Sequence, residues 1–412
     1  MMTPAAIAEL RSGWRILVAC ALGIAASAIA LPYYSIGALT KPIELETGWS
    51  RSDIQFAIAF SSGLGALTAP LTGWMVDRLG VRMVALPGFA GVALGMIVAA
   101  MAGSPLVFYL GFALTALLGA GTNPVVWSKV VTSRFDHARG TALGLALVGT
   151  ALSAILLPVL ITSLIQRTNW HVALAVVAML PLLLSLPAAW FWLPSEPART
   201  ACAAAEPAVS IRSAVLSLRF AVLAISVLCG YLAVSGVLTS LVPAFTDRGL
   251  PPARAAVIAG TVGLAMIPGR VLIGMLIDRC WAPAVGCVIL LIPAAACLVL
   301  VRATDSLQLT LCCLALGLAA GAELDLLAFL TARYFGRDRF AKLYALLYAG
   351  LAIGSATAPA MFSRLREVSG DYAASFLSSA ALFAVAGILL LLLGPYPAMS
   401  GPSDEGLHDD AD

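Results

Sequence analysis

The sequence is poor in charge. Only 11% of its 412 residues are Asp, Glu, Lys or Arg, whereas 61% are hydrophobic. An ordinary soluble domain carries about 25% charged residues, so this chain could not cover its apolar side chains with a surface that faces water. The formal net charge of +3 is too small to suggest a nucleic-acid partner. The composition argues against a water-soluble globular protein and predicts that the lipid bilayer is the main solvent.

Patterns that hold metals, nucleotides or catalytic nucleophiles are missing. The three histidines, His137, His171 and His408, fall at predicted helix ends or in the C-terminal tail. The eight cysteines form no C-x-x-C pair and lie mostly in apolar runs, as small core residues do. The sequence contains no G-x-x-x-x-G-K-[ST], H-E-x-x-H, G-x-S-x-G or dinucleotide fingerprint. We therefore expect no metal, no cofactor and no ATP-driven mechanism in this chain.

Long apolar runs dominate the sequence instead. A bilayer core needs about 20 apolar residues per helix. By that measure the sequence predicts twelve spans, at 14–39, 53–75, 83–103, 105–132, 140–165, 171–193, 219–245, 254–277, 282–302, 306–332, 340–363 and 372–394. An even number of spans places both termini on one side of the membrane. Lys and Arg are more frequent in the loops on that side, which predicts cytoplasmic termini in a cell (inner or plasma) membrane.

A polar, proline-containing stretch divides the spans into two sets. The predicted organisation is an N-terminal six-helix half over 1–193, a cytoplasmic linker over 194–218, and a C-terminal six-helix half over 219–394. The final stretch, 395–412, is acidic and contains Gly, Pro and Ser, which predicts disorder. The sequence thus predicts an all-α membrane protein.

The two halves carry a repeated turn. A G-x-x-x-D-R sequence ends one apolar run at 73–78 and recurs about 200 residues later at 274–279. Internal repeats of this size, with a binding site between them, are typical of secondary transporters. The repeat indicates two pseudo-symmetric halves. The charged residues of these turns and of the loop that follows the first are predicted to hold a cytoplasmic gate: Asp77, Arg78, Arg82, Asp278 and Arg279.

The turn from Gly73 to Arg82 resembles the loop between helices two and three of the major facilitator superfamily. Three further stretches, 46–51, 133–144 and 321–336, are similar to the branch that includes monocarboxylate transporters and oxalate–formate exchangers. The resemblance implies the major facilitator fold and alternating access. Drug–proton antiporters of this superfamily usually carry an arginine midway along helix four, and the matching position here is Thr115, which argues against drug efflux.

Arg270 is the most informative charged residue. It lies in the predicted span 254–277, eight residues before Asp278, which places it roughly 12 Å inside the cytoplasmic face. A cation at that depth costs at least ~3 kcal/mol and persists only if it is paired or faces a wet cavity. A guanidinium matches a carboxylate in geometry, and the carboxylate transporters resembled here place a substrate-binding arginine on this helix. Arg270 is predicted to bind substrate, with a structural ion pair as the alternative.

Glu323 and Asp325 are the other charges predicted to be buried. They lie ten and eight residues before Arg333, at the depth of Arg270. Residues two apart on a helix are separated by about 200° of rotation, so the two carboxyl groups cannot both face one cavity squarely. One acid is predicted to carry a coupled proton; a silent structural pair is the alternative.

Further cavity residues are suggested by polar and aromatic side chains. Asn123 and Trp127 are four residues apart in the span 105–132, so they are expected to share a helix face. They would line a cavity or pack between helices. Tyr34, Tyr231 and Tyr348 are weaker cavity candidates, because tyrosine also anchors helix ends at the membrane interface.

The sequence as a whole predicts a secondary active transporter that functions as a monomer and has no nucleic-acid partner. The expected substrate is a small organic anion, a mono- or dicarboxylate, moved with protons. Proton-driven efflux of a hydrophobic compound is the main alternative, and a membrane-embedded enzyme is a more distant one.

Overall fold

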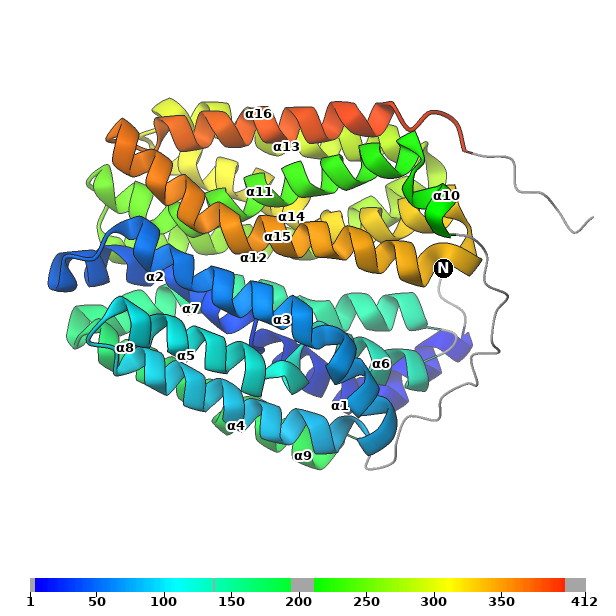
Figure 1. The fold of residues 1–412 in the computed structure, drawn as a ribbon, viewed down its shortest axis with the longest axis horizontal. Coiled ribbons are helices and arrows are strands. Elements are labelled where there is room, and N and C mark those ends of the chain that lie inside the picture. The colour runs from blue at the N-terminus through cyan, green and yellow to red at the C-terminus, as the bar shows by residue number, and fades with distance from the viewer. Residues whose placement is uncertain (1–3, 136–137, 194–210, 397–412) are drawn as a thin grey trace, which may run out of the picture.

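The computed structural model describes residues 4–135, 138–193 and 211–396, and all regular structure within them is helical. Figure 1 shows the helices of the first half, α1 to α9, gathered in a lower layer and those of the second half, α11 to α16, in an upper layer. The layers meet where α2, α3 and α7 pack against α11, α15 and α12. The predicted halves therefore lie side by side along their length, as a site between them requires.

The helices of the first half are α1 (Pro4–Ala25), α2 (Ala30–Thr47), α3 (Arg51–Leu79), α4 (Val81–Ala100), α5 (Pro105–Leu118), η1 (Ala120–Thr122), α6 (Pro124–Arg134), α7 (Arg139–Arg167), α8 (Trp170–Leu180), η2 (Pro181–Ser185) and α9 (Leu186–Trp192). Those of the second half are α11 (Leu218–Asp247), α12 (Pro252–Arg279), α13 (Ala282–Arg302), α14 (Ser306–Phe335), α15 (Arg337–Ser369) and α16 (Ala373–Leu391), preceded by the short α10 (Ile211–Val215). Most of the predicted linker and tail lies outside the described residues.

Twelve crossings can be traced through the described helices. Ten segments are long and apolar enough to span a bilayer by themselves, and the pair α1 and α2, bent by 42°, makes an eleventh. The remaining crossing is the shorter apolar helix α5, continued through η1 into α6. The predicted twelve-helix layout thus agrees with the structure, although two of the predicted helices are broken.

The break in the fourth crossing corrects one prediction. The span 105–132 is not one helix, because Asn123 has an extended backbone (φ −63°, ψ 150°) between η1 and α6. The cause is local, since Pro124 disfavours helical geometry in the residue before it. The expectation that Asn123 and Trp127 share one helix face is therefore wrong.

The two ends of the bundle are distinguished by the chain termini. The proximal end is the one where α1 begins and α16 ends, on the right in Figure 1. The distal end carries the turns α2–α3, α11–α12 and α15–α16. If the termini are cytoplasmic, the distal end faces the outside.

Glycines hold α12 and α14 close together. A Cβ atom on Gly321 of α14 would overlap the carbonyl oxygen of Met266, and one on Gly269 of α12 would overlap that of Leu318. Small residues allow such backbone contact between membrane helices. The close approach matters for function because Arg270 directly follows Gly269 and Glu323 lies two residues after Gly321, so this contact sets the distance between the two helices at the level of both charges.

We expect Gly321→Val to destabilise the protein, since the new side chain would push α12 and α14 apart. Overpacking of this kind costs about 1–3 kcal/mol. The matched control is Gly350→Val on α15, where an added Cβ has no neighbour within 4 Å. Thermal unfolding of the two purified variants should give a clearly lower midpoint for the Gly321 variant. Equal midpoints would show that the α12–α14 contact is not tight.

Candidate substrate chamber

A chamber of about 150 Å³ lies between the two halves, at mid-depth of the bundle. Its walls come from the α1–α2 break, α2, α6, α7, α11, α12, α14 and α15, so both halves contribute. Five of the side chains predicted from the sequence line it: Arg270, Glu323, Tyr34, Tyr231 and Tyr348. Residues far apart in the sequence therefore meet at one place.

Arg270 and Glu323 supply the charge of the chamber. They come from α12 and α14, and both side chains are partly buried. Arg270 lines the chamber together with Tyr34 and Tyr231. Glu323 lines the same chamber beside Tyr33 and Tyr231, and its Oε1 is buried with no hydrogen-bond donor among the described residues. One cation and one acid therefore share a small, aromatic-walled space.

Tyrosines form much of the remaining wall. Tyr33 and Tyr34 of α2 pack edge to face, with ring centroids 5.1 Å apart. Tyr348 of α15 lies 6.3 Å from Tyr344 by the same measure, and Tyr231 comes from α11. These rings give a flat apolar surface with hydroxyl groups at its edge, which suits a small molecule that has one polar end.

Asn123 and Trp127 lie apart from the chamber. Asn123 lines a neighbouring cavity of about 40 Å³ that shares Pro124 and Tyr348 with the chamber. Its Nδ2 donates a hydrogen bond to the Gly65 carbonyl at 3.3 Å. Trp127 is fully buried, stacks on Phe89 with centroids 5.9 Å apart, and donates from Nε1 to the Thr122 carbonyl. In this conformation Trp127 packs the core of the first half.

The remaining predicted site residues lie outside the chamber or outside the described side chains. The side chains of Asp325, Asp77 and Asp278 are not among those described. Arg78 and Arg82 lie over the rings of Trp74 and Trp190, each 4.5 Å from a centroid, and Arg279 is exposed at the proximal end. Within the described residues no group of three or more His, Cys, Asp or Glu side chains could hold a metal.

A cluster of charges at the distal end was not predicted. This distal ion cluster comprises Lys41, Glu44, Arg51, Asp247 and Arg366. Arg51 binds Asp247 through both terminal nitrogens, at 2.6 and 3.0 Å, and Glu44 through Nε at 2.7 Å. Lys41 and Arg366 each contact Asp247 at 3.0 Å. Because Lys41 and Arg51 belong to the first half and Asp247 to the second, these ion pairs join the halves.

Further hydrogen bonds extend the distal ion cluster. Glu367 of α15 accepts hydrogen bonds from the Ser52 backbone NH at 2.8 Å and from its hydroxyl at 3.1 Å, again across the halves. The Tyr372 hydroxyl accepts from Arg51 at 2.9 Å. Burial raises the pKa of the Tyr372 phenol, and nearby Arg51 opposes that rise. The distal end is thus held closed by contacts that a sequence search for buried charge misses, since each charged residue lies just outside a predicted span.

Known proteins resemble this chain in both sequence and fold. A sequence model of the Major Facilitator Superfamily matches residues 16–330. The chain belongs to the major facilitator superfamily. It is therefore a multi-pass membrane transporter rather than a membrane-embedded enzyme.

Among curated relatives, the chain is 25% identical to monocarboxylate transporter 11 of Homo sapiens, over 92% of this chain and 83% of the relative. It is 26% identical to monocarboxylate transporter 13 of Rattus norvegicus, over 79% and 76% of the two chains. Among solved structures, a D-xylose–proton symporter superposes with a TM-score of 0.73 at 14% identity, covering 93% of this chain and 98% of the other. The structural likeness shows the fold, and the resemblance to the monocarboxylate transporter branch is confirmed.

Proposed function

We propose that this transporter moves a small monocarboxylate across the membrane together with a proton. The observation that carries the proposal is that Arg270 and Glu323 line one chamber whose walls come from both halves. A guanidinium kept at this depth needs an anionic or wet environment, and a carboxylate substrate supplies the first. The monocarboxylate transporters named above support the same substrate class.

The charge balance of the chamber favours one carboxylate on the substrate. Arg270 is the single Lys or Arg among the described lining residues. Lys129 of α6 donates its Nζ to the Gly73 carbonyl at 2.7 Å and does not line the chamber. With one cation available, a dianion would leave a negative charge uncompensated in a poorly hydrated space, which is costly.

Glu323 provides the proposed proton site. An ionised Glu323 and an incoming carboxylate would compete for Arg270, whereas a protonated Glu323 would not repel the substrate. Proton binding therefore favours substrate binding, and release of one favours release of the other. Asp325, two residues further along α14, stays the alternative proton carrier.

The proposal includes the orientation of the protein in the membrane and the relative movement of its two halves. The termini lie in the cytoplasm of a cell with the protein in its inner or plasma membrane, so the distal ion cluster faces outside. The protein functions as a monomer, and its two halves, 1–193 and 219–394, rotate relative to each other about the chamber. The proximal residues Asp77, Arg78, Arg82, Asp278 and Arg279 hold the cytoplasmic gate when the distal end opens.

The coupling is tested with Glu323→Gln, which keeps the shape of the side chain and removes the proton site. We expect uptake of a labelled small monocarboxylate into proteoliposomes to lose its stimulation by an inward proton gradient. Exchange of labelled for unlabelled acid, which needs no net proton movement, should be retained. A Glu323→Gln protein that still follows the proton gradient would remove Glu323 as the proton site.

The substrate class is tested with the same vesicles. Wild-type protein should take up a small monocarboxylate and leave a neutral amphiphile of similar size behind. Movement of the neutral compound with no response to carboxylates would favour proton-driven efflux of hydrophobic compounds instead.

A further inference from the structure

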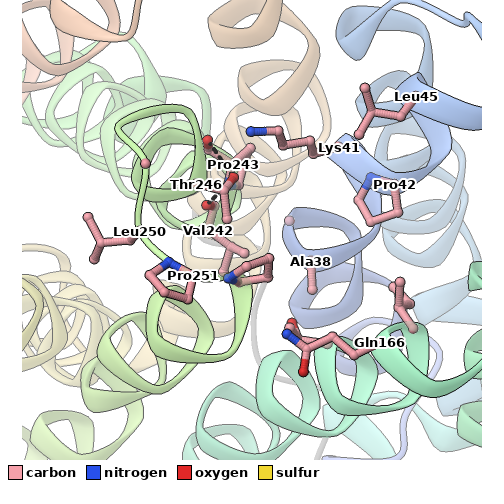
Figure 2. A pocket seen from close by; sticks show the side chains of 15 residues that line it. Ala38, Lys41, Pro42, Leu45, Gln166, Val242, Pro243, Thr246, Leu250 and Pro251 are labelled. Atoms are coloured by element: carbon pink, nitrogen blue, oxygen red, sulfur yellow. Dashed lines mark hydrogen bonds between the residues drawn. The ribbon is translucent and has the colours of Figure 1, made fainter.

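A larger cavity lies at the distal end, away from the chamber. Its volume is about 380 Å³, and its walls come from α2, α7, α11, the α11–α12 turn and the start of α12. Figure 2 shows Lys41 reaching across the top of this distal cavity and Gln166 of α7 on the opposite side. The volume falls within the range of about 300–1,000 Å³ that small-molecule sites occupy.

The distal cavity lies in line with the chamber. Between them is a small cavity of about 30 Å³. It shares one set of wall residues with the chamber and another with the distal cavity: Tyr33, Tyr34 and Leu238 with the former, and Gly37, Ala38 and Val242 with the latter. A molecule in the distal cavity is therefore separated from the chamber mainly by the Tyr33–Tyr34 pair and Leu238.

The lining of the distal cavity has one cationic side and one apolar side. Lys41 is its single charged residue, and no acid is among its lining residues, all of which the structure describes. The Lys41 side chain is 30% exposed and contacts Asp247 at 3.0 Å. The apolar side is formed largely by rigid or branched residues: Pro42, Leu45, Val242, Pro243, Leu250, Pro251 and Pro252. Such a surface matches a molecule with one carboxylate and a hydrophobic body.

We propose that the distal cavity is a second organic-acid site, which binds monocarboxylates with an aryl or branched apolar body. The carboxylate lies at Lys41 and the body lies against the proline-rich side. This inference deepens the proposed carboxylate function and rests on it. The distal cavity is more than twice the volume of the chamber, so it accepts acids that the chamber excludes in this conformation.

Occupancy of the distal cavity has a consequence for the distal ion cluster. A bound carboxylate competes with Asp247 for Lys41 and so weakens one of the ion pairs that join the halves. A substrate arriving from the distal side would in this way loosen the closed end before it passes Tyr33 and Tyr34.

The test compares the binding of 3-phenylpropionate and propionate to the purified full chain by calorimetry at low salt. Gln166 lines the distal cavity and is exposed, so its substitution should not disturb folding. Gln166→Glu should weaken the binding of 3-phenylpropionate, relative to that of propionate, by roughly three- to tenfold. Gln166→Lys should strengthen that binding by a similar factor, as one unit charge would in a partly hydrated site. The matched controls are Thr168→Glu and Thr168→Lys, two residues further on at an exposed position outside the lining.

Arg270→Gln separates the two sites. It should remove propionate binding in the chamber and leave 3-phenylpropionate bound in the distal cavity. If Arg270→Gln abolished the binding of both acids, the second site would be overturned. It would also be overturned if neither Gln166 variant changed the ratio of the affinities for 3-phenylpropionate and propionate. Wild-type protein that binds propionate but not 3-phenylpropionate would also overturn the second site, but it would not contradict the proposed function. Wild-type protein that binds neither acid would end the carboxylate proposal itself.

Discussion

Arg270→Gln is expected to lower monocarboxylate uptake by at least about 100-fold. Glutamine keeps most of the length of the side chain and can still donate a hydrogen bond, but it lacks the charge and the planar fork that hold a carboxylate. Truncating one partner of a buried, hydrogen-bonded charge pair typically costs about 2–5 kcal/mol. Every 1.4 kcal/mol is about a tenfold change in affinity, so a loss in the middle of that range exceeds 100-fold.

The measurement is initial uptake into proteoliposomes, with protein content matched between variants. The control is Arg254→Gln, the same substitution at an exposed position near the distal start of the same helix. It should retain uptake within about twofold, because exposed charges contribute little. A ligand-induced rise in the unfolding midpoint gives a second readout, since binding to the folded form stabilises it by about 2.7 kcal/mol at 100 times the Kd. An Arg270→Gln protein that still transports the acid would refute the role of Arg270 in substrate binding.

Asp247→Asn is expected to open the distal end. The substitution keeps the shape of the side chain but leaves Lys41, Arg51 and Arg366 without the carboxylate they share. Arg51 is only 3% exposed, and removing the partner of a buried charge costs about 3–5 kcal/mol. Asp247 itself is 21% exposed, and water screens part of that loss. A remaining effect of about 2 kcal/mol would raise the ratio of distal-open to distal-closed protein roughly 30-fold.

The opening can be followed by the distance between spin labels at Thr168→Cys and Val368→Cys, two exposed distal positions in different halves. Cys202 and Cys280 are replaced by serine to limit labelling elsewhere. Asp371→Asn is the matched control, because Asp371 is exposed at the same end and accepts from the Ala373 backbone within its own half. An Asp247 variant whose distance distribution equals that of wild type would show that the distal ion cluster does not hold the halves together.

The chamber was largely predictable because depth in the membrane can be read from sequence. Arg270 and Glu323 stand out as charges in apolar runs, and the helical rise places them at one level. Local geometry limited the prediction elsewhere. The periodicity that places Trp127 on one face with Asn123 holds only in an unbroken helix, and Pro124 breaks that helix.

The distal ion cluster was not predictable in the same way. Lys41, Arg51 and Asp247 lie at helix ends, where charge is common and carries no signal of burial. Arg51 and Asp247 are 196 residues apart in the chain, and their contact depends on how the two halves dock.

The apolar runs, the repeated G-x-x-x-D-R turns and the charges within the runs determined the helical membrane fold, its two halves and the depth of the substrate chamber. These features follow from the free-energy cost of placing polar groups in lipid. Each stretch of sequence avoids that cost by itself, through its own apolar side chains and helical backbone hydrogen bonds. The tertiary structure alone decided which side chains meet across the halves, where the fourth crossing breaks, and that a second cavity lies in line with the first. Those outcomes depend on distances between helices that are remote in the sequence, and periodicity along one helix does not encode them.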